Sequence, residues 1–452
     1  MTSNTIVSRP FRTHRHYLSL YPTKKSLTRV SILLSLFALC SAGLTGCGGA
    51  TCDRIETERT AFLQRGPNTS DTHIEMTIPF VIANRLVEPH IQKIKPIDIP
   101  LSNLGSLASY FGKLSIAPTR MEIKPASQDH LGFRLDFEVR RNGNKAFGMY
   151  LESEVKPEID LATGKVTIGF TPDVLQKATP GLAPDAKQNL GDLIYDQIPG
   201  PARLLVSRSL VDSVVGSTLE RLIDTFYNMA KQKMLPKLSQ MSQLEFNLPD
   251  VPLSNARITS SGDNGGRLQI GITTTLPVRK GIASPSAKEP SRHMISIRTS
   301  GSVAAELVNW AMAKGTLPNR YNAEGKAKKD GEFWPGLDWI SGEEAPMKIY
   351  LWDIEQPCMR LTMSATPSLA VRGGNIEVTA KAAKADDVEA TAVTKIGVWF
   401  KLLWKDAINM TQKKSARIKM KVAGKEMMIV VEKAAIEGDE IVSEIYLTDD
   451  VQ

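Results

Sequence analysis

Residues that could perform metal or nucleophilic chemistry are scarce in this sequence. Its 452 residues include four cysteines and six histidines, and no two cysteines form a CxxC pair. It has no GxSxG elbow, HExxH motif, phosphate-binding loop or GxGxxG motif. Four histidines lie beyond residue 46 without ligand spacing and are interpreted as surface or capping residues: His73, His90, His130 and His293. We therefore expect no metal, no cofactor and no enzymatic activity. A hydrolase whose residues meet only in the folded chain is the least favoured alternative.

The amino-terminal region lacks acidic residues and lacks a full membrane-spanning run. Its apolar run, residues 30–44, has 15 residues, whereas a spanning helix needs about 20. A basic segment followed by a short apolar segment is typical of a secretory signal. The basic residues before the run are Arg9, Arg12, Arg15, Lys24, Lys25 and Arg29.

The residues that end the apolar run, Leu44-Thr45-Gly46-Cys47, resemble the lipobox of bacterial lipoproteins. The resemblance implies that residues 1–46 are a signal peptide that is removed, and that the thiol of Cys47 carries a lipid. Several acyl chains together hold a protein stably on a membrane. Gly48 rather than Asp follows the cysteine, which by resemblance to enteric bacteria indicates the outer membrane. The alternative is an ordinary signal peptide that leaves Cys47 as a free thiol.

Without the signal peptide the chain has almost no net charge. The full sequence has 56 basic and 48 acidic residues, a formal charge of +8, and the signal holds six of the basic ones. The mature chain is therefore nearly neutral, and we expect no nucleic-acid partner. The two remaining cysteines, Cys52 and Cys358, could pair in an oxidising periplasm or stay free thiols.

Alternating apolar and polar residues predict antiparallel hairpins in the first half of the mature chain. A flexible tether is expected over residues 47–70, then a strand over 73–78 and a short helix through Ile82 and Ile91. Period-two alternation with tight turns indicates hairpins that have one apolar face and one wet face. The expected hairpin segments are residues 133–140 and 147–151 around Asn142-Gly143-Asn144, residues 166–170 after Thr163-Gly164, and residues 244–278 around 263–266.

Between these hairpins the apolar period changes to that of a helix. Apolar residues recur at spacings of three and four from Val211 to Met229. Pro201 suits a first helical turn, and Pro236 marks an end. We expect a helix over about residues 202–235, roughly 50 Å long at 1.5 Å per residue. Such a helix suits an elongated partner, for example a long curved sheet.

A second unit is expected after a proline-containing linker at residues 281–292. It begins with a strand over residues 294–297 and a helix through Val303 and Leu307. A polar insertion at residues 318–345 precedes further strands, which are expected around 361–363, 369–371, 376–378, 398–404 and 417–422. The order of strand, helix and hairpins thus occurs twice, in residues 71–280 and 293–452.

This order resembles that of the tubular lipid-binding superfamily, in particular the proteins related to bactericidal/permeability-increasing protein. The likeness is carried by residues 234–238 (MLPKL) with 248–253 (LPDVPL), by the linker, and by residues 366–371 (TPSLAV) with 375–378 (NIEV). It implies an α+β fold in which a curved antiparallel sheet wraps a long helix, with acyl chains bound between them. That family's second domain closes with another long helix, which this sequence lacks. The second domain is therefore expected to be incomplete, minimal or wrongly matched.

An apolar groove along the long helix is the expected ligand site. The alternative is that the same apolar face packs into a core without a ligand, because large side chains could close the space. The residues predicted to line the groove are Val211, Val215, Leu219, Leu222, Phe226, Met229, Phe133, Phe137, Val303 and Leu307.

Two lysine-rich stretches could contact a membrane, but a structural interpretation is favoured for both. In the insertion, aromatic residues beside the lysines are expected to fold onto their own domain. In the later stretch, the lysines are expected to protect a solvated strand edge rather than to give one hairpin a basic face. The residues concerned are Lys326, Lys328, Lys329, Phe333, Trp334 and Trp339 in the insertion, and Lys413, Lys414, Arg417, Lys419, Lys421 and Lys425 in the later stretch.

These observations favour a non-enzymatic lipoprotein that is anchored to a membrane through Cys47 and binds a lipid or another acyl-chain ligand. Such a protein would shield acyl chains from water and shuttle lipid in the cell envelope. A structural or interaction lipoprotein with a fully packed core is the main alternative.

Overall fold

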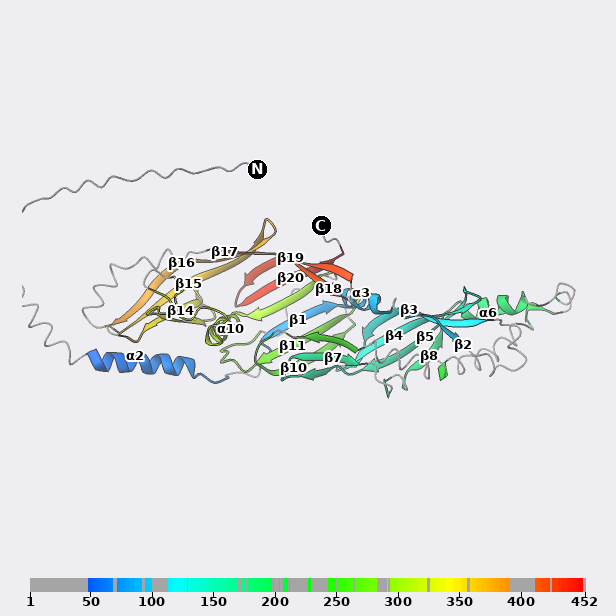
Figure 1. Ribbon diagram of the computed structural model, residues 1–452, viewed down its shortest axis with the longest axis horizontal. Helices are drawn as coiled ribbons and strands as arrows, with labels where there is room; N and C mark the ends of the chain where they lie inside the picture. The colour runs from blue at the N-terminus through cyan, green and yellow to red at the C-terminus, as the bar shows by residue number, and fades with distance from the viewer. Residues whose placement is uncertain are drawn as a thin grey trace, which may run out of the picture.

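The computed structural model is elongated, and its β-sheets follow one another along the long axis (Figure 1). Strands β13 to β17 form one end, a seven-stranded sheet forms the middle, and strands β2 to β5 with β8 form the other end. The structure describes residues 48–67, 71–91, 94–99, 113–127, 129–169, 173–174, 177–196, 198, 203, 206–209, 211, 227–228, 243–248, 250–262, 265–282, 291, 293–322, 326–355, 358–390, 411–422 and 425–449.

The first end sheet is antiparallel, in the order β2-β3-β4-β5-β8. Asn142 and Gly143 form the predicted turn between β4 and β5, with positive φ angles of 50° and 89°. Alternate residues of β4, from Leu131 to Val139, are at most 3% exposed, so the sheet has the predicted apolar and wet faces. The strands are β2 (Ile97–Ile99), β3 (Leu114–Pro125), β4 (Leu131–Arg141), β5 (Asn144–Val155) and β8 (Thr179–Leu182).

A three-stranded sheet in the order β6-β7-β9 accompanies it. Gly164, with a φ of 67°, lies in the predicted turn between the first two of these strands. Helix α6 (Ala186–Tyr195) lies at the outer end of β5 (Figure 1). The strands are β6 (Glu158–Asp160), β7 (Lys165–Gly169) and β9 (Gln243–Asn247).

The middle sheet has seven strands in the order β10-β11-β1-β12-β20-β19-β18. Strand β1 pairs with β11 on one side and with β12 on the other. Strands from both sides of the predicted linker therefore share one sheet, and backbone hydrogen bonds join the two predicted units. The strands are β1 (Ile74–Pro79), β10 (Leu253–Ser261), β11 (Arg267–Thr274), β12 (Ile295–Ser300), β18 (Arg417–Val422), β19 (Lys425–Glu437) and β20 (Glu440–Thr448).

The second end sheet is also antiparallel, in the order β13-β14-β15-β16-β17. The segments expected around residues 361–363 and 369–371 are parts of one long strand, β15, which turns into β16 at Gly373 and Gly374. Strand β13 occupies part of the segment predicted to be a polar insertion. The strands are β13 (Trp334–Trp339), β14 (Met347–Asp353), β15 (Met359–Arg372), β16 (Asn375–Ala390) and β17 (Thr411–Ser415).

Helices α3 (Phe80–Ile91) and α10 (Gly301–Ala313) confirm the two short helices predicted from spacing. The side chain of Ser300 caps α10 by accepting a hydrogen bond from the backbone of Val303. A third helix, α2 (Gly48–Leu63), lies where the sequence predicts a flexible tether. Antiparallel sheets with few helices make the fold α+β in the broad sense.

The predicted long helix is not continuous over residues 202–235. Val206 and Ser207 are not helical, and the backbone of Val211 donates to the Ser207 carbonyl at 3.3 Å. A helical turn therefore begins at Ser207, a residue type favoured at helix starts. Most of the rest of the predicted helix, and the strand expected at residues 398–404, lie outside the described residues.

The start of the predicted linker packs against the middle sheet. The backbone of Ile282 donates to the Thr72 carbonyl at 2.8 Å, just before β1. A side chain at Gly281 would lie 2.5 Å from the Asp71 side chain, so glycine permits this close approach. Among the described helices, none is long and apolar enough to cross a bilayer.

Candidate functional site

The predicted groove residues that the structure describes meet in one apolar cluster. Phe133 and Phe137 of β4, Val211 and Val303 are buried in it, and Leu307 packs against it. The remaining predicted groove residues lie outside the described residues: Val215, Leu219, Leu222, Phe226 and Met229.

This cluster is continuous from the first end sheet to α10. The inward face of β4 supplies Phe133 and Phe137, and the middle sheet supplies Ile270 and Ile272 of β11. Helix α3 lies between these sheets and contributes Val87. The apolar interior therefore follows the long axis of the molecule past the predicted domain boundary.

The described groove residues are closely packed. Phe133, Phe137, Val211 and Val303 are each at most 4% exposed. Burial of this extent excludes water from these side chains and gains roughly 25 cal/mol per Å² of buried apolar surface. At these positions the interior resembles a filled core.

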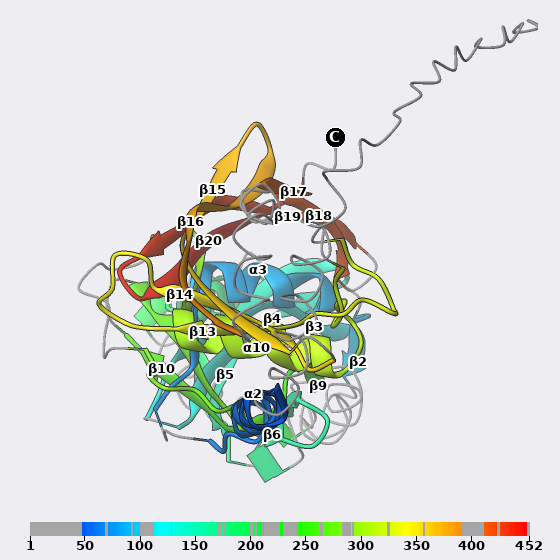
Figure 2. The same ribbon diagram turned by 90° about the vertical axis from the view of Figure 1, so that its left-hand side faces the viewer.

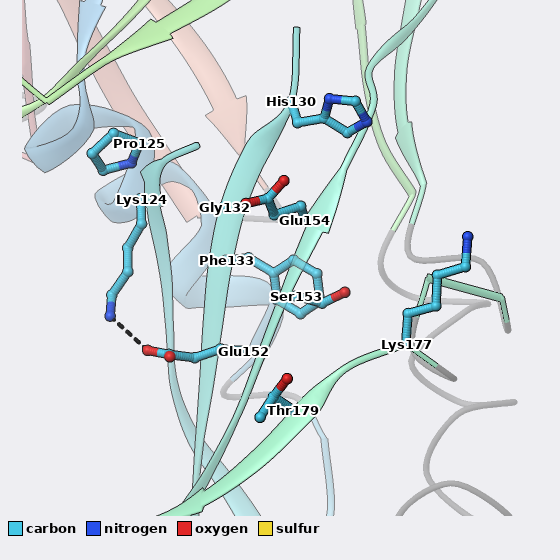
Figure 3. A pocket seen from close by; sticks show the side chains of 10 residues that line it. All are labelled: Lys124, Pro125, His130, Gly132, Phe133, Glu152, Ser153, Glu154, Lys177 and Thr179. Carbon is cyan, nitrogen blue, oxygen red and sulfur yellow. Dashed lines mark hydrogen bonds and ion pairs between the residues drawn. The ribbon is translucent and has the colours of Figure 1, made fainter. Parts of the chain in front are cut away.

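A pocket of about 590 Å³ opens beside the end of β5 (Figure 3). Strand β8 pairs with β5 only from Met149 to Glu152, and the pocket lies where this pairing ends. Gly132 of β4 lines the pocket, and a side chain there would lie 3.1 Å from the Pro125 carbonyl oxygen, so glycine permits the close approach of β3. The residues that line the pocket are Lys124, Pro125, His130, Gly132, Phe133, Glu152, Ser153, Glu154, Lys177 and Thr179.

The rim of the pocket carries both signs of charge. Lys124 and Glu152 form an ion pair at 2.8 Å across the sheet (Figure 3). The Ser127 hydroxyl lies 3.3 Å from Nδ1 of His130 and donates to Glu154 at 3.5 Å. Lys177 adds a second ammonium group on the far side (Figure 3). Such a rim can bind a polar group that carries both an anion and a cation.

Phe133 connects this polar pocket with the apolar cluster. Its side chain is buried in the cluster, and it also lines the pocket. The pocket adjoins the middle sheet, since the Ser260 hydroxyl of β10 donates to the His130 carbonyl at 3.1 Å. Sequence reasoning identified Phe133 but missed the rim. Gly132, a glycine near the start of an alternating strand, was the available signal, because strand glycines often mark a close approach or an open space.

His73 departs from its expected surface position. It is fully buried, and the backbone of Thr274 donates to its Nδ1 at 2.9 Å. Burial lowers the pKa of His73, so the ring stays neutral with its proton on Nε2. The pairing ties the start of β1 to the end of β11, which is a structural role.

Helix α2 is fixed to the second end sheet, which corrects the predicted tether. Cys52 and Cys358 form a disulfide with their Cα atoms 5.2 Å apart, so the two cysteines do pair. Ile55 is buried beside this disulfide, and Phe62 lies 5.0 Å from the Trp352 ring. These tertiary contacts stabilise a segment whose composition alone suggested a flexible chain.

The aromatic residues of the predicted insertion fold onto their own predicted unit, residues 293–452, as expected. Phe333 and Trp339 are buried, the former in the apolar cluster of β14 and β15. The Trp334 ring centroid lies 4.8 Å from the guanidinium carbon of Arg59 and 4.1 Å from that of Arg320. The nearby lysines 326, 328 and 329 are exposed.

The later lysine-rich stretch does not form one hairpin. Strand β17 pairs with β16, whereas β18 pairs with β19 in the middle sheet, and buried Ala416 lies between them. Both strands are edges of their sheets, which agrees with the expected lysine-protected edges. Lys413 also forms an ion pair with Glu377 at 2.8 Å. The side chains of Lys421 and Lys425 lie outside the described residues.

Within the described residues, no group of three or more histidine, cysteine or acidic side chains is placed to hold a metal ion. No known family model matches the sequence, and no curated protein matches it.

Among solved structures, the chain is similar to two P47 proteins of Clostridium botulinum. For P47 of strain E1 the TM-score is 0.39 at 10% identity, covering 83% of this chain and 99% of P47. For P47 of strain A2 the TM-score is 0.35 at 11% identity, covering 84% of this chain and 98% of P47. At these scores the likeness does not bear on fold or function.

Proposed function

We propose that this chain is a non-enzymatic lipoprotein, anchored through acylated Cys47, that binds a lipid or another acyl-chain ligand in its apolar interior. The observation that carries the proposal is the single apolar cluster that runs from β4 through β11 to α10. Five predicted groove residues belong to this cluster or pack on it. The mixed-charge pocket at Phe133 supports an amphiphilic ligand, since it places polar groups beside the apolar interior.

The anchor is tested by the Cys47→Ala variant in a bacterium that acylates lipoproteins. We expect the wild-type protein to sediment with membranes and its first peptide to carry the mass of a lipid. The variant should lose that mass and leave the membrane fraction. A wild-type protein whose amino-terminal peptide is unmodified would contradict the anchor.

The ligand site is tested by uptake of a fluorescent fatty acid into a soluble form that begins at Gly48. Reversal of the Lys177 charge in Lys177→Glu should weaken binding several-fold, because it removes a cation from the pocket rim. The matched control, Lys329→Glu, changes an exposed lysine near β13 and should bind like the wild type. Equal binding by all three proteins would place the ligand away from this pocket.

A structural lipoprotein without a ligand is the second candidate. The observation that favours it is the nearly complete burial of the described groove residues Phe133, Phe137, Val211 and Val303. It predicts that the soluble form takes up no fluorescent lipid of any class.

A further inference from the structure

Helix α2 is docked lengthwise on the second end sheet. Successive contacts of this helix follow β14 and β15 from their outer loop toward α10. Cys52 bonds to Cys358 at the outer loop, and Glu58 pairs with Arg360 one step inward. Phe62 then packs on Tyr350, with ring centroids 5.4 Å apart.

The inner end of the helix is held by buried charges. Just after α2, Arg65 donates to Glu306 of α10 at 2.8 Å, and its second nitrogen lies 3.7 Å from Asp338 of β13. Arg279 contacts the same Asp338 at 2.5 Å. Removing one partner from such a buried network leaves an uncompensated charge. The helix is therefore fixed at both ends and along its length.

The axis of α2 follows the long axis of the molecule. It lies along the lower edge in Figure 1 and is seen nearly end-on below β13 and β14 in Figure 2. Its first residue, Gly48, lies toward the outer end, beyond the disulfide. The first end sheet, with the β4–β5 turn at its tip, lies on the opposite side of the middle sheet (Figure 1).

Cys47 is joined directly to Gly48, so its Cα lies about 3.8 Å from the first residue of α2. At about 1.5 Å of rise per residue, only some 6 Å along the helix separates Gly48 from Cys52. No length of flexible chain is therefore available between an acylated Cys47 and the locked helix.

We propose that α2 is a rigid mount, locked by the Cys52–Cys358 disulfide, that holds the β13–β17 end at the anchoring lipid surface and directs the β2–β5 end away from it. This inference rests on the acylation of Cys47 in the proposed function. With α2 fixed in this way, the protein keeps one orientation relative to the membrane, whereas a flexible tether would let it rotate.

The fixed position of α2 is tested first without a membrane, by hydrogen exchange of the soluble form that begins at Gly48. We expect amides of residues 50–63 to be protected in the oxidised protein. They should exchange at least ten-fold faster in a Cys52→Ser, Cys358→Ser, Phe62→Ala variant, while the β4–β5 hairpin keeps its protection and so reports an intact fold. Reduction of the wild type by dithiothreitol gives a second route to the same comparison. Fast exchange of α2 in the oxidised protein would overturn the mount.

The orientation is tested with the full lipidated chain on vesicles of phosphatidylethanolamine and phosphatidylglycerol that carry a headgroup quencher. A fluorescent amino acid replaces either Glu355, in the β14–β15 loop, or Asn142, in the β4–β5 turn; both positions are exposed. We expect quenching at position 355 and none at 142, with quenching at 142 appearing in the unlocked variant. Equal quenching at both positions in the oxidised wild type overturns the mount. A chain that does not float with the vesicles overturns the anchor, whatever the exchange experiment shows.

Discussion

Asp353 places a carboxyl group on the apolar face of the second end sheet. It is 8% exposed, lies on the same face of β14 as Leu351 and Ile349, and accepts a hydrogen bond from the Glu355 backbone at 2.9 Å. Burial raises the pKa of Asp353 to about 6, opposed by that hydrogen bond. The folded protein therefore holds this proton more tightly than the unfolded chain does.

The raised pKa gives Asp353 a defined effect on stability. The group binds more protons in the folded state between about pH 4 and pH 6, so its favourable contribution is present at low pH and is lost as the pH rises through 6. We expect Asp353→Asn to be about 2–3 kcal/mol more stable than the wild type at pH 8. Below pH 4 the difference should vanish. Urea unfolding at pH 8 and below pH 4 measures this difference in the free energy of unfolding. An equal difference at the two pH values would contradict the raised pKa of Asp353.

Gly266 fixes α3 to the middle sheet through a backbone that only glycine adopts easily. Its φ is 83°, and a side chain there would lie 2.4 Å from the ring of Phe80, the first residue of α3. We expect Gly266→Ala to destabilise the protein by about 3 kcal/mol, from backbone strain and overpacking together. Gly143→Ala is the control, because its φ is 89° with no atom within 4 Å, and it should lose only about 1 kcal/mol. Thermal unfolding measures both losses of stability. Equal losses for the two variants would show that overpacking against Phe80 contributes nothing.

At the scale of elements, local patterns predicted the strands well and their distant partners poorly. The hairpin of β4 and β5 follows from alternation and the Asn142-Gly143 turn, because everything that defines it lies within a few residues. The pairing of β1 with β12 joins residues more than 200 positions apart, and no local signal specifies it. Helix α2 was missed for the same reason, since its stability comes from Cys358 and Trp352 and not from its own composition.

An ion network holds the junction of β1, β12 and β20. Arg298 is nearly buried and contacts Glu75 at 3.2 Å and Glu440 at 2.7 Å. Arg298→Ala should destabilise the protein by about 3 kcal/mol, because it removes the cation that neutralises these two partly buried carboxylates. Lys433→Ala removes a more exposed ion pair with Glu437 and should lose less than about 1 kcal/mol. Similar losses for the two variants in urea would show that the junction does not depend on Arg298.

At the scale of the whole molecule, the shared middle sheet makes the two predicted units one body. Its apolar interior continues across the linker, so a ligand bound near Phe133 would affect the stability of both halves. The sequence indicated the apolar faces through their period. It left open whether these faces line a groove or form a core, because the space between side chains depends on contacts that only the fold provides.

The proposal of a lipid ligand is tested most directly by solvent extraction and mass spectrometry of the soluble form that begins at Gly48, purified without detergent. We expect a co-purifying lipid in stoichiometric amount, whose headgroup and acyl chains would identify the ligand class. Protein that carries no lipid, and that afterwards takes up neither a fluorescent fatty acid nor a fluorescent phospholipid, would contradict it.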